Sequence, residues 1–288
     1  MVLFNRAHTA EQAPLVVVLP HAGASAYQFG ALALHLPSDW SVQCLELPGR
    51  GRRVREPFVT DFDAAVTDIN NRLFGLENRP WVLLGHSLGA HLGMAVLRRR
   101  QAAGQSLPLV FFPSGAVAPS AYAINPVASL PSDTFWEKIS QFGGVPEAVL
   151  ADAEYRQYFE TILRHDLALL EQAPIYAMPV TSRTPVPPLA VPVVVLMGDA
   201  DAAASRATSW QAETAFPLVV EPFAGGHFYL FEAWPGVANA IVRHACTRSL
   251  PVANPASGGG SPDISDLSGT SGISGPYGNT VPVRQAEG

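Results

Sequence analysis

Short apolar runs alternate with helical patterns along the first 250 residues, and this alternation limits the fold more than any other feature. Strands that are apolar along their whole length need cover on both faces, and the intervening helices supply it. The runs that predict strands are Leu15–Leu19, Val42–Leu47, Trp81–Leu84, Leu109–Phe112, Val191–Met197 and Leu218–Val220. The sequence therefore predicts an α/β protein with a mostly parallel central sheet and helices on both faces.

The composition changes sharply after Leu250. Glycine, serine and proline make up half of the 38 residues from Pro251 to Gly288, and apolar periodicity is almost absent there. Such a segment buries too little apolar surface to offset its ordering entropy. We expect residues 1–250 to form one folded domain and residues 251–288 to form a disordered tail. The alternative is a peptide that folds on a partner.

Charge and cysteine content exclude several classes of function. The chain has 18 Lys and Arg against 24 Asp and Glu, a net charge of −6, so nucleic acid is not an expected partner. Two cysteines, Cys44 and Cys246, cannot form a disulfide scaffold. No apolar run has the roughly 18 to 20 residues that span a membrane. We interpret the apolar run near the N-terminus as a core strand, and we expect a cytoplasmic protein, with a monomer as its expected state.

The segment from about residue 119 to residue 192 breaks the alternation, because it contains helical patterns and prolines but no clear strand. At more than 70 residues it is longer than an ordinary crossover connection. We interpret it as a helical lid insertion over the sheet. Four of its apolar residues are candidates to line a chamber, or else to pack the lid on the sheet: Phe135, Ile139, Leu163 and Leu167.

The pentapeptide Gly-His-Ser-Leu-Gly at Gly85–Gly89 lies between a predicted strand and a predicted helix. A serine on such a tight turn is exposed above the sheet at the positive end of the helix, and the flanking glycines remove side chains that would clash. This context predicts a nucleophile at Ser87. The alternative is a turn serine that only caps the helix.

A serine nucleophile needs a base and, in the α/β-hydrolase arrangement, an acid that lies between the two in the chain. His227 follows two glycines after the last strand, where the base of this arrangement belongs. Asp199 and Asp201 both follow the fifth strand. We favour Asp201 because its loop has more room to reach the histidine, whereas Asp199 could cap the turn.

The negative charge of a tetrahedral intermediate needs hydrogen-bond donors. The N–H of Leu88, directly after the serine, is one candidate. The second is expected from the loop after the first strand, and we select the N–H of Ala22 because small residues there let the backbone approach a substrate. His21 is interpreted as structural.

Several motifs in this order resemble those of type II thioesterases, the stand-alone α/β-hydrolases that accompany nonribosomal peptide and polyketide synthases. The matching segments are Leu19–Ser25, Pro48–Arg53, Gly85–Ala90, Ser114–Pro119, Phe142–Pro146, Leu163–Asp166, Gly198–Asp201 and Gly225–Phe228. In the family pattern the nucleophile maps to Ser87, the acid to Asp201 and the base to His227. Ala24 stands where the family usually has a second glycine.

The resemblance implies an enzyme that hydrolyses acyl or aminoacyl thioesters from the phosphopantetheine arm of a carrier protein, for editing or release, without a cofactor or a metal. Four arginines after the second strand could meet an acidic carrier or its phosphate, or could form a solvated loop: Arg50, Arg52, Arg53 and Arg55. The alternatives are an acyltransferase or cyclase, a general esterase, and a protein that only binds acyl groups.

Overall fold

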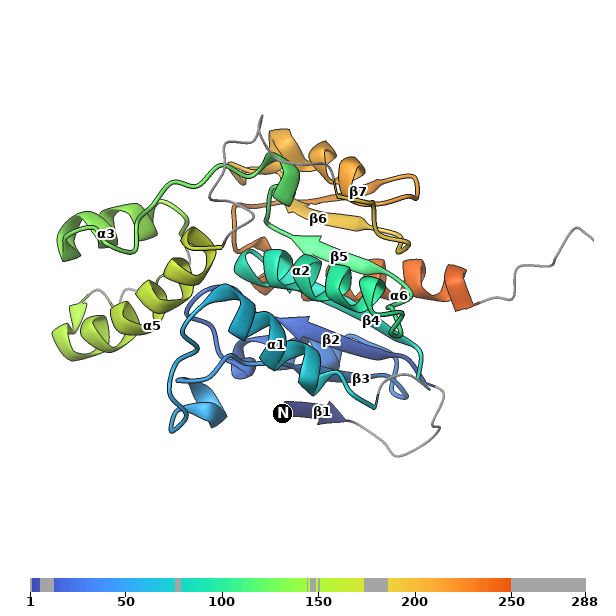
Figure 1. Ribbon diagram of the computed structural model, residues 1–288, viewed down its shortest axis with the longest axis horizontal. Coiled ribbons are helices and arrows are strands. Elements are labelled where there is room, and N and C mark those ends of the chain that lie inside the picture. Colours follow the sequence, from blue (N-terminus) through green and yellow to red (C-terminus); the bar gives the residue numbers. More distant parts are fainter. Residues whose placement is uncertain are drawn as a thin grey trace, which may run out of the picture. The chain divides into compact units, whose positions relative to one another are not determined.

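The computed structural model contains a seven-stranded sheet (Figure 1). It describes residues 2–5, 13–75, 79–143, 145, 149, 151–173 and 186–249. The strands are β1 (Val2–Asn5), β2 (Leu15–Leu19), β3 (Ser41–Cys44), β4 (Trp81–His86), β5 (Phe111–Ser114), β6 (Val194–Gly198) and β7 (Val219–Phe223). Their order is β1-β3-β2-β4-β5-β6-β7, and β1 runs antiparallel to β3 while all other neighbours are parallel. The predicted α/β-hydrolase class with a mostly parallel sheet is confirmed.

Helices cover both faces of this sheet. Figure 1 shows α1 (Phe62–Arg72) and α2 (Leu88–Ala102) in front of it, and α6 (Trp234–Ser249) behind it. Among the described residues, 3-10 segments join the larger elements at Ala26–Leu34, Gly51–Arg53, Pro119–Ala121, Ala204–Glu213 and Tyr229–Phe231. Helices α3 (Ser132–Ser140) and α5 (Ala153–Glu171) lie side by side at one end of the strands (Figure 1).

Alternate side chains of β2 enter two different cores, as the two-residue period of a strand requires. Leu15, Val17 and Leu19 pack with residues of α1 and α2. Val16 and Val18 pack with residues of the 3-10 segment Ala26–Leu34 and of α6. The continuous apolar run in the sequence therefore reflects burial on both faces.

The strand boundaries differ in detail from the predicted ones. Strand β5 begins and ends two residues later than predicted, because its pairing with β4 starts at Leu83 opposite Phe111 and continues to His86 opposite Ser114. Strand β1 was not predicted, although three of its four residues are apolar. The sequence predicted strands only over continuous apolar runs. In the structure, β4 and β5 extend beyond these runs to His86 and Ser114.

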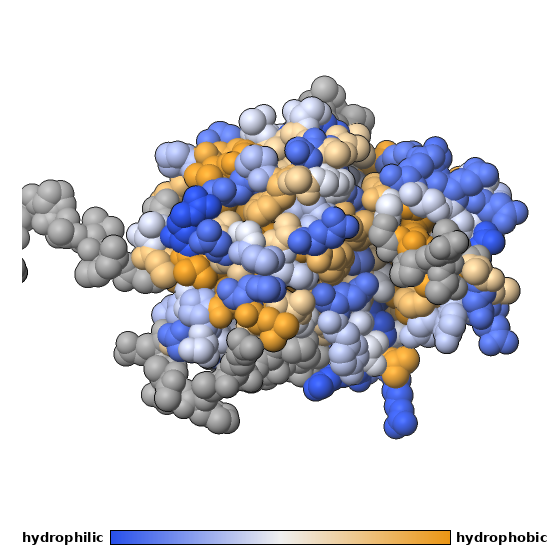
Figure 2. Space-filling view, turned by 180° about the vertical axis from the view of Figure 1, so that it is seen from behind, coloured by the Kyte–Doolittle hydropathy of each residue, from blue (hydrophilic) through white to orange (hydrophobic). Residues whose placement is uncertain are grey.

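The chain divides into two units, Met1–Leu250 and Pro251–Gly288, and the single folded domain expected for residues 1–250 stays a prediction. Residues 251–288 lie outside the described residues, so the disordered tail stays a prediction. No helix within the described ranges is long and apolar enough to cross a membrane. On the face opposite to that of Figure 1, hydrophobic residues are scattered among hydrophilic ones rather than gathered in one large patch (Figure 2).

Candidate active site

Ser87 lies at the turn between β4 and α2, in a backbone conformation that side chains rarely tolerate. Its φ is 53° and its ψ is −115°, and among the described residues it alone has a positive φ without being glycine. Such a conformation costs on the order of 1–3 kcal/mol and persists only where its surroundings enforce it. The N–H of Ser87 donates to the carbonyl oxygen of Ser114 at 2.8 Å, which ties the turn to the end of β5.

Gly85 and Gly89 make this turn possible because backbone atoms occupy the space of a side chain at both positions. A Cβ on Gly85 would lie 2.4 Å from the carbonyl oxygen of Gly89. A Cβ on Gly89 would lie 2.0 Å from the carbonyl oxygen of Leu19, at the end of β2. Neither approach is possible for a larger residue, so the glycines allow α2 to pack closely on the sheet.

His227 and Asp201 extend from the loops after β7 and β6 and are hydrogen-bonded to each other. Nδ1 of His227 is 2.8 Å from Oδ2 of Asp201, and the N–H of Ala203 donates to Oδ1 of Asp201 at 2.8 Å. Burial opposes ionisation, but the hydrogen bonds from His227 and Ala203 lower the pKa of the Asp201 carboxyl below its usual value. A charged carboxylate at Nδ1 holds the proton there and leaves Nε2 to accept another.

Asp199 has a different role from Asp201. Its Oδ1 accepts the N–H of Gly225 at 3.0 Å, and the N–H of Ala200 donates to the carbonyl oxygen of Gly225 at 3.0 Å. These bonds join the loop after β6 to the loop that carries His227. The structure therefore brings Asp201 to the histidine and uses Asp199 to hold the two loops together.

The predicted donor loop after β2 forms a tight turn. The N–H of Ala24 donates to the carbonyl oxygen of His21 at 3.1 Å, and Gly23 has a φ of +80°, which glycine adopts without strain. Gly23 N–H donates to Oδ2 of Asp166 at 2.7 Å. The N–H of Ala22 has no hydrogen-bond partner among the described residues. Ala22 and Ser87 line the same cavity, which supports the predicted donor role.

A cavity of about 870 Å³, counting its open mouth, joins these groups to the helical segment. Ser87, His227 and Ala22 line one side of it. Apolar side chains from α3, α5 and the chain between them line the other side: Trp136, Ile139, Phe142, Phe159, Leu163 and Leu167. An apolar pocket next to a few convergent polar groups is typical of a small-molecule site.

Three of the four proposed chamber residues line this cavity, and Phe135 does not. Ile139, Leu163 and Leu167 are among its lining side chains. Phe135 is fully buried and packs with Trp136 between the two helices. The described part of residues 119–192 contains the 3-10 segment Pro119–Ala121 and helices α3 and α5, separated by irregular chain. Its action as a lid stays a prediction.

Sequence reasoning missed a buried polar network beneath the site. Nδ1 of His86 is 2.9 Å from Oγ of Ser114, and this oxygen is 2.7 Å from the hydroxyl of Tyr229. Burial lowers the pKa of His86 well below its usual value and lowers the pKa of His21 to about 4. Both rings are therefore neutral near pH 7. The signal available in the sequence was limited to His86 and Ser114, which lie in two of the family-like motifs.

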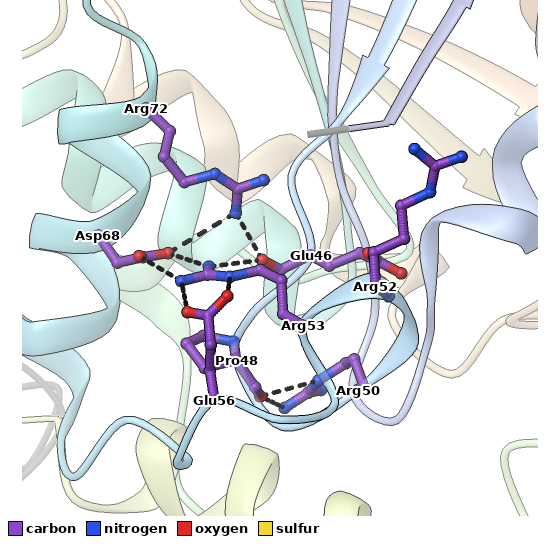
Figure 3. Close-up of polar contacts among 8 residues, drawn as sticks. All are labelled: Glu46, Pro48, Arg50, Arg52, Arg53, Glu56, Asp68 and Arg72. Carbon is purple, nitrogen blue, oxygen red and sulfur yellow. Dashed lines mark hydrogen bonds and ion pairs between the residues drawn. The ribbon is translucent and has the colours of Figure 1, made fainter.

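The four arginines after β3 do not act as one surface cluster, and the structure corrects both interpretations for Arg50 and Arg53. Arg50 is buried, and Arg53 lies between Glu56 and Asp68 at 2.6 and 2.7 Å. Figure 3 shows Arg53 inside this network and Arg52 pointing away from it. Arg53 pairs with Asp68 of α1, and Arg50 pairs with Asp166 of α5, so two of the four cations are neutralised internally.

Arg52 and Arg55 are the members of this group that stay exposed. They are the ones that could still meet an acidic partner. Among the residues that the structure describes, no group of three or more His, Cys, Asp or Glu side chains is arranged to hold a metal ion.

The model of the family described as "Thioesterase domain" matches residues 14–245. The chain is 30% identical over 242 residues to a probable cadicidin biosynthesis thioesterase of Streptomyces griseus, covering 83% of this chain and 64% of that one. It is 29% identical to the AMB antimetabolite synthetase AmbE of Pseudomonas aeruginosa, covering 88% of this chain and 12% of that one. It therefore spans less than two thirds of the length of either relative.

A solved structure, the type II thioesterase BorB from the borrelidin biosynthetic cluster, superimposes with a TM-score of 0.71 at 29% identity. The match covers 84% of this chain and 97% of the BorB chain. The likeness therefore extends over nearly all of that chain.

Proposed function

The chain belongs to the thioesterase domain family, and on this premise we propose that it hydrolyses acyl or aminoacyl thioesters on the phosphopantetheine arm of carrier proteins. The relatives named in antibiotic and antimetabolite biosynthesis support a place in nonribosomal peptide or polyketide synthesis. The observation that carries the proposal is the meeting of Ser87, His227 and an apolar wall in one cavity. The cytoplasmic location predicted from the sequence is part of this proposal.

In the proposed reaction, Ser87 Oγ attacks the thioester carbonyl carbon while Nε2 of His227 accepts the hydroxyl proton. Asp201 stabilises the imidazolium that forms. The N–H groups of Ala22 and Leu88 stabilise the negative oxygen of the tetrahedral intermediate. Its collapse breaks the C–S bond, and the departing sulfur takes the proton from His227. A water molecule, activated by the same histidine, then hydrolyses the acyl-enzyme and restores the serine.

The two sides of the cavity suit such a substrate. A thioester on a long arm can reach the polar side, and an acyl chain can occupy the side formed by α3 and α5. Arg52 and Arg55 remain exposed for contact with an acidic carrier. Binding energy from the carrier can then be used to hold the thioester over Ser87.

The test compares hydrolysis of one acyl group on a carrier protein, on CoA and in a simple oxygen ester. We expect the highest kcat/KM for the carrier form and slow cleavage of the ester. Added amines and alcohols measure acyl transfer in the same assay. Equal kcat/KM for carrier and CoA forms, together with fast ester cleavage, would identify a general esterase instead.

A further inference from the structure

Asp166 on α5 forms a fully buried junction between three distant parts of the chain. Its side chain is 1% exposed, and that of Arg50 is 4% exposed. Nη2 of Arg50 donates to Oδ1 of Asp166 at 2.6 Å, and Nη1 donates to Oδ2. The same Oδ2 accepts the N–H of Gly23 at 2.7 Å. The carboxylate thus links the loop after β3 to the loop after β2.

Arg50 is itself held by the backbone next to it. Its Nε and Nη2 lie 3.4 and 3.3 Å from the carbonyl oxygen of Pro48, as Figure 3 shows. A guanidinium held in this way presents two N–H donors in one plane to the carboxylate. The two hydrogen bonds fix the orientation of the carboxylate, which a single lysine ammonium cannot do.

A second contact from the same face of α5 confines the donor loop. Leu163, three residues before Asp166, lies so close to Gly23 that an added Cβ would be 2.7 Å from its Cδ2 atom. Gly23 therefore receives a polar contact and an apolar contact from one helix. Ala22 precedes it directly, so holding the peptide between them restricts where the loop presents the N–H of Ala22, which belongs to the adjacent peptide of the backbone.

We propose that Arg50 and Asp166 are a positioning pair, which holds the loop after β2 so that Ala22 can donate to the substrate oxyanion. Donors that are oriented before the reaction stabilise the transition state without reorganising during it. This inference rests on the proposed hydrolase function. It also means that α5 is part of the catalytic framework, because a displacement of the helix would withdraw both contacts from Gly23.

The test uses Asp166→Asn and Arg50→Lys. The first substitution keeps the size of the side chain. Its amide nitrogen must replace either Oδ1, which faces Nη2 of Arg50, or Oδ2, which faces both Nη1 of Arg50 and the N–H of Gly23, so at least one contact is lost. Arg50→Lys keeps both charges and removes the two-pronged geometry. If Asp166→Asn folds poorly, Arg50→Lys can be used for the same measurements, because it retains a buried ion pair.

Glu213 provides a matched control. Its side chain is 1% exposed, it is paired with Arg98, and its Oε1 accepts the N–H of Ser120 at 2.8 Å. It therefore resembles Asp166 in burial, in its arginine partner and in its bond to a backbone N–H, but it does not line the cavity. Glu213→Gln should lower the Tm and leave kcat per active site unchanged.

Three measurements separate positioning from stability. The amount of covalent adduct with a phosphonofluoridate counts working sites, so kcat is expressed per active site. Steady-state rates with one acyl-CoA separate kcat from KM. The inhibition constant of an alkylboronic acid, which forms a tetrahedral adduct with Ser87, reports the oxyanion contacts. For Asp166→Asn we expect kcat to fall about tenfold to a hundredfold, the boronate to weaken by a similar factor, and KM to change little.

A smaller loss in kcat for Arg50→Lys, with a correspondingly smaller weakening of the boronate, would support the proposal. Unchanged kcat per active site in both variants would overturn it, and so would equal losses in Glu213→Gln. A rise in KM alone would assign Asp166 to substrate binding instead. These outcomes concern the pair only, because failure of the proposed hydrolysis appears separately as absent turnover in the unmodified protein or as activity retained in Ser87→Ala.

Discussion

The two walls of the cavity are built in different ways. On the sheet side, backbone hydrogen bonds and close glycine packing fix the reactive groups at the ends of strands: Ser87 at β4, His227 after β7 and Ala22 after β2. On the helical side, apolar side chains from α3 and α5 pack mainly against one another. We therefore expect the sheet wall to define where the reaction takes place and the helical wall to define which acyl chains fit.

The largest expected effect lies in the sheet wall. Ser87→Ala should reduce turnover of acyl-CoA by about 10⁵-fold or more, because no acyl-enzyme can form. The substitution does not relieve the backbone strain at this position, since alanine occupies the same turn with the same positive φ. The effect is measured as the rate at which thioester hydrolysis releases free thiol, and circular dichroism verifies the fold. Activity near that of the unmodified enzyme would remove Ser87 from the mechanism.

Substitutions of the two aspartates after β6 distinguish a residue that takes part in the reaction from one that holds the loops of the same wall together. Asp201→Asn should lower kcat on the order of 10³- to 10⁴-fold, because the amide no longer stabilises the imidazolium or holds the proton on Nδ1. Asp199→Asn keeps an oxygen that accepts the N–H of Gly225, so its rate should stay within about threefold. Both variants are assayed with the same acyl-CoA. The reverse ranking would identify Asp199 as the acid.

This difference between the walls explains what could be predicted from the sequence. The turn at Ser87 is local, because five consecutive residues and their flanking patterns specify it. The choice of Asp201 followed from chain order and loop reach, and the hydrogen bond to His227 agrees with it. Arg50 and Asp166 lie 116 residues apart, and no local pattern reports a contact between them.

The helical wall was harder to predict for a related reason. Periodicity marks the apolar face of a helix, but it does not distinguish a side chain that lines a cavity from one that fills a helix interface. Ile139 and Phe135 lie one turn apart on α3. Ile139 lines the cavity, while Phe135 is buried against Trp136.

A substitution in the helical wall should alter selectivity more than chemistry. Ile139→Trp fills part of the cavity, so kcat/KM for a long acyl chain should fall about tenfold while that for an acetyl group stays within about twofold. A series of acyl-CoA substrates of increasing length measures the shift. Phe135→Leu is the matched control on the same helix, and its length profile should stay unchanged. Equal losses for all chain lengths would show that the helical wall supports the chemistry directly.

The smallest expected effect concerns the exposed arginines outside both walls. Arg52→Glu and Arg55→Glu should each lower kcat/KM for an acyl-carrier substrate by about threefold at low salt, with the loss disappearing as ionic strength rises. The same acyl group on free pantetheine lacks the carrier's charges, so its rate should not change. Arg243→Glu makes the same charge change on α6, where the side chain is 52% exposed, and serves as the control. A similar loss in that variant would reflect net charge alone. A loss confined to Arg52 and Arg55 would place the carrier beside the loop whose buried member, Arg50, faces Asp166.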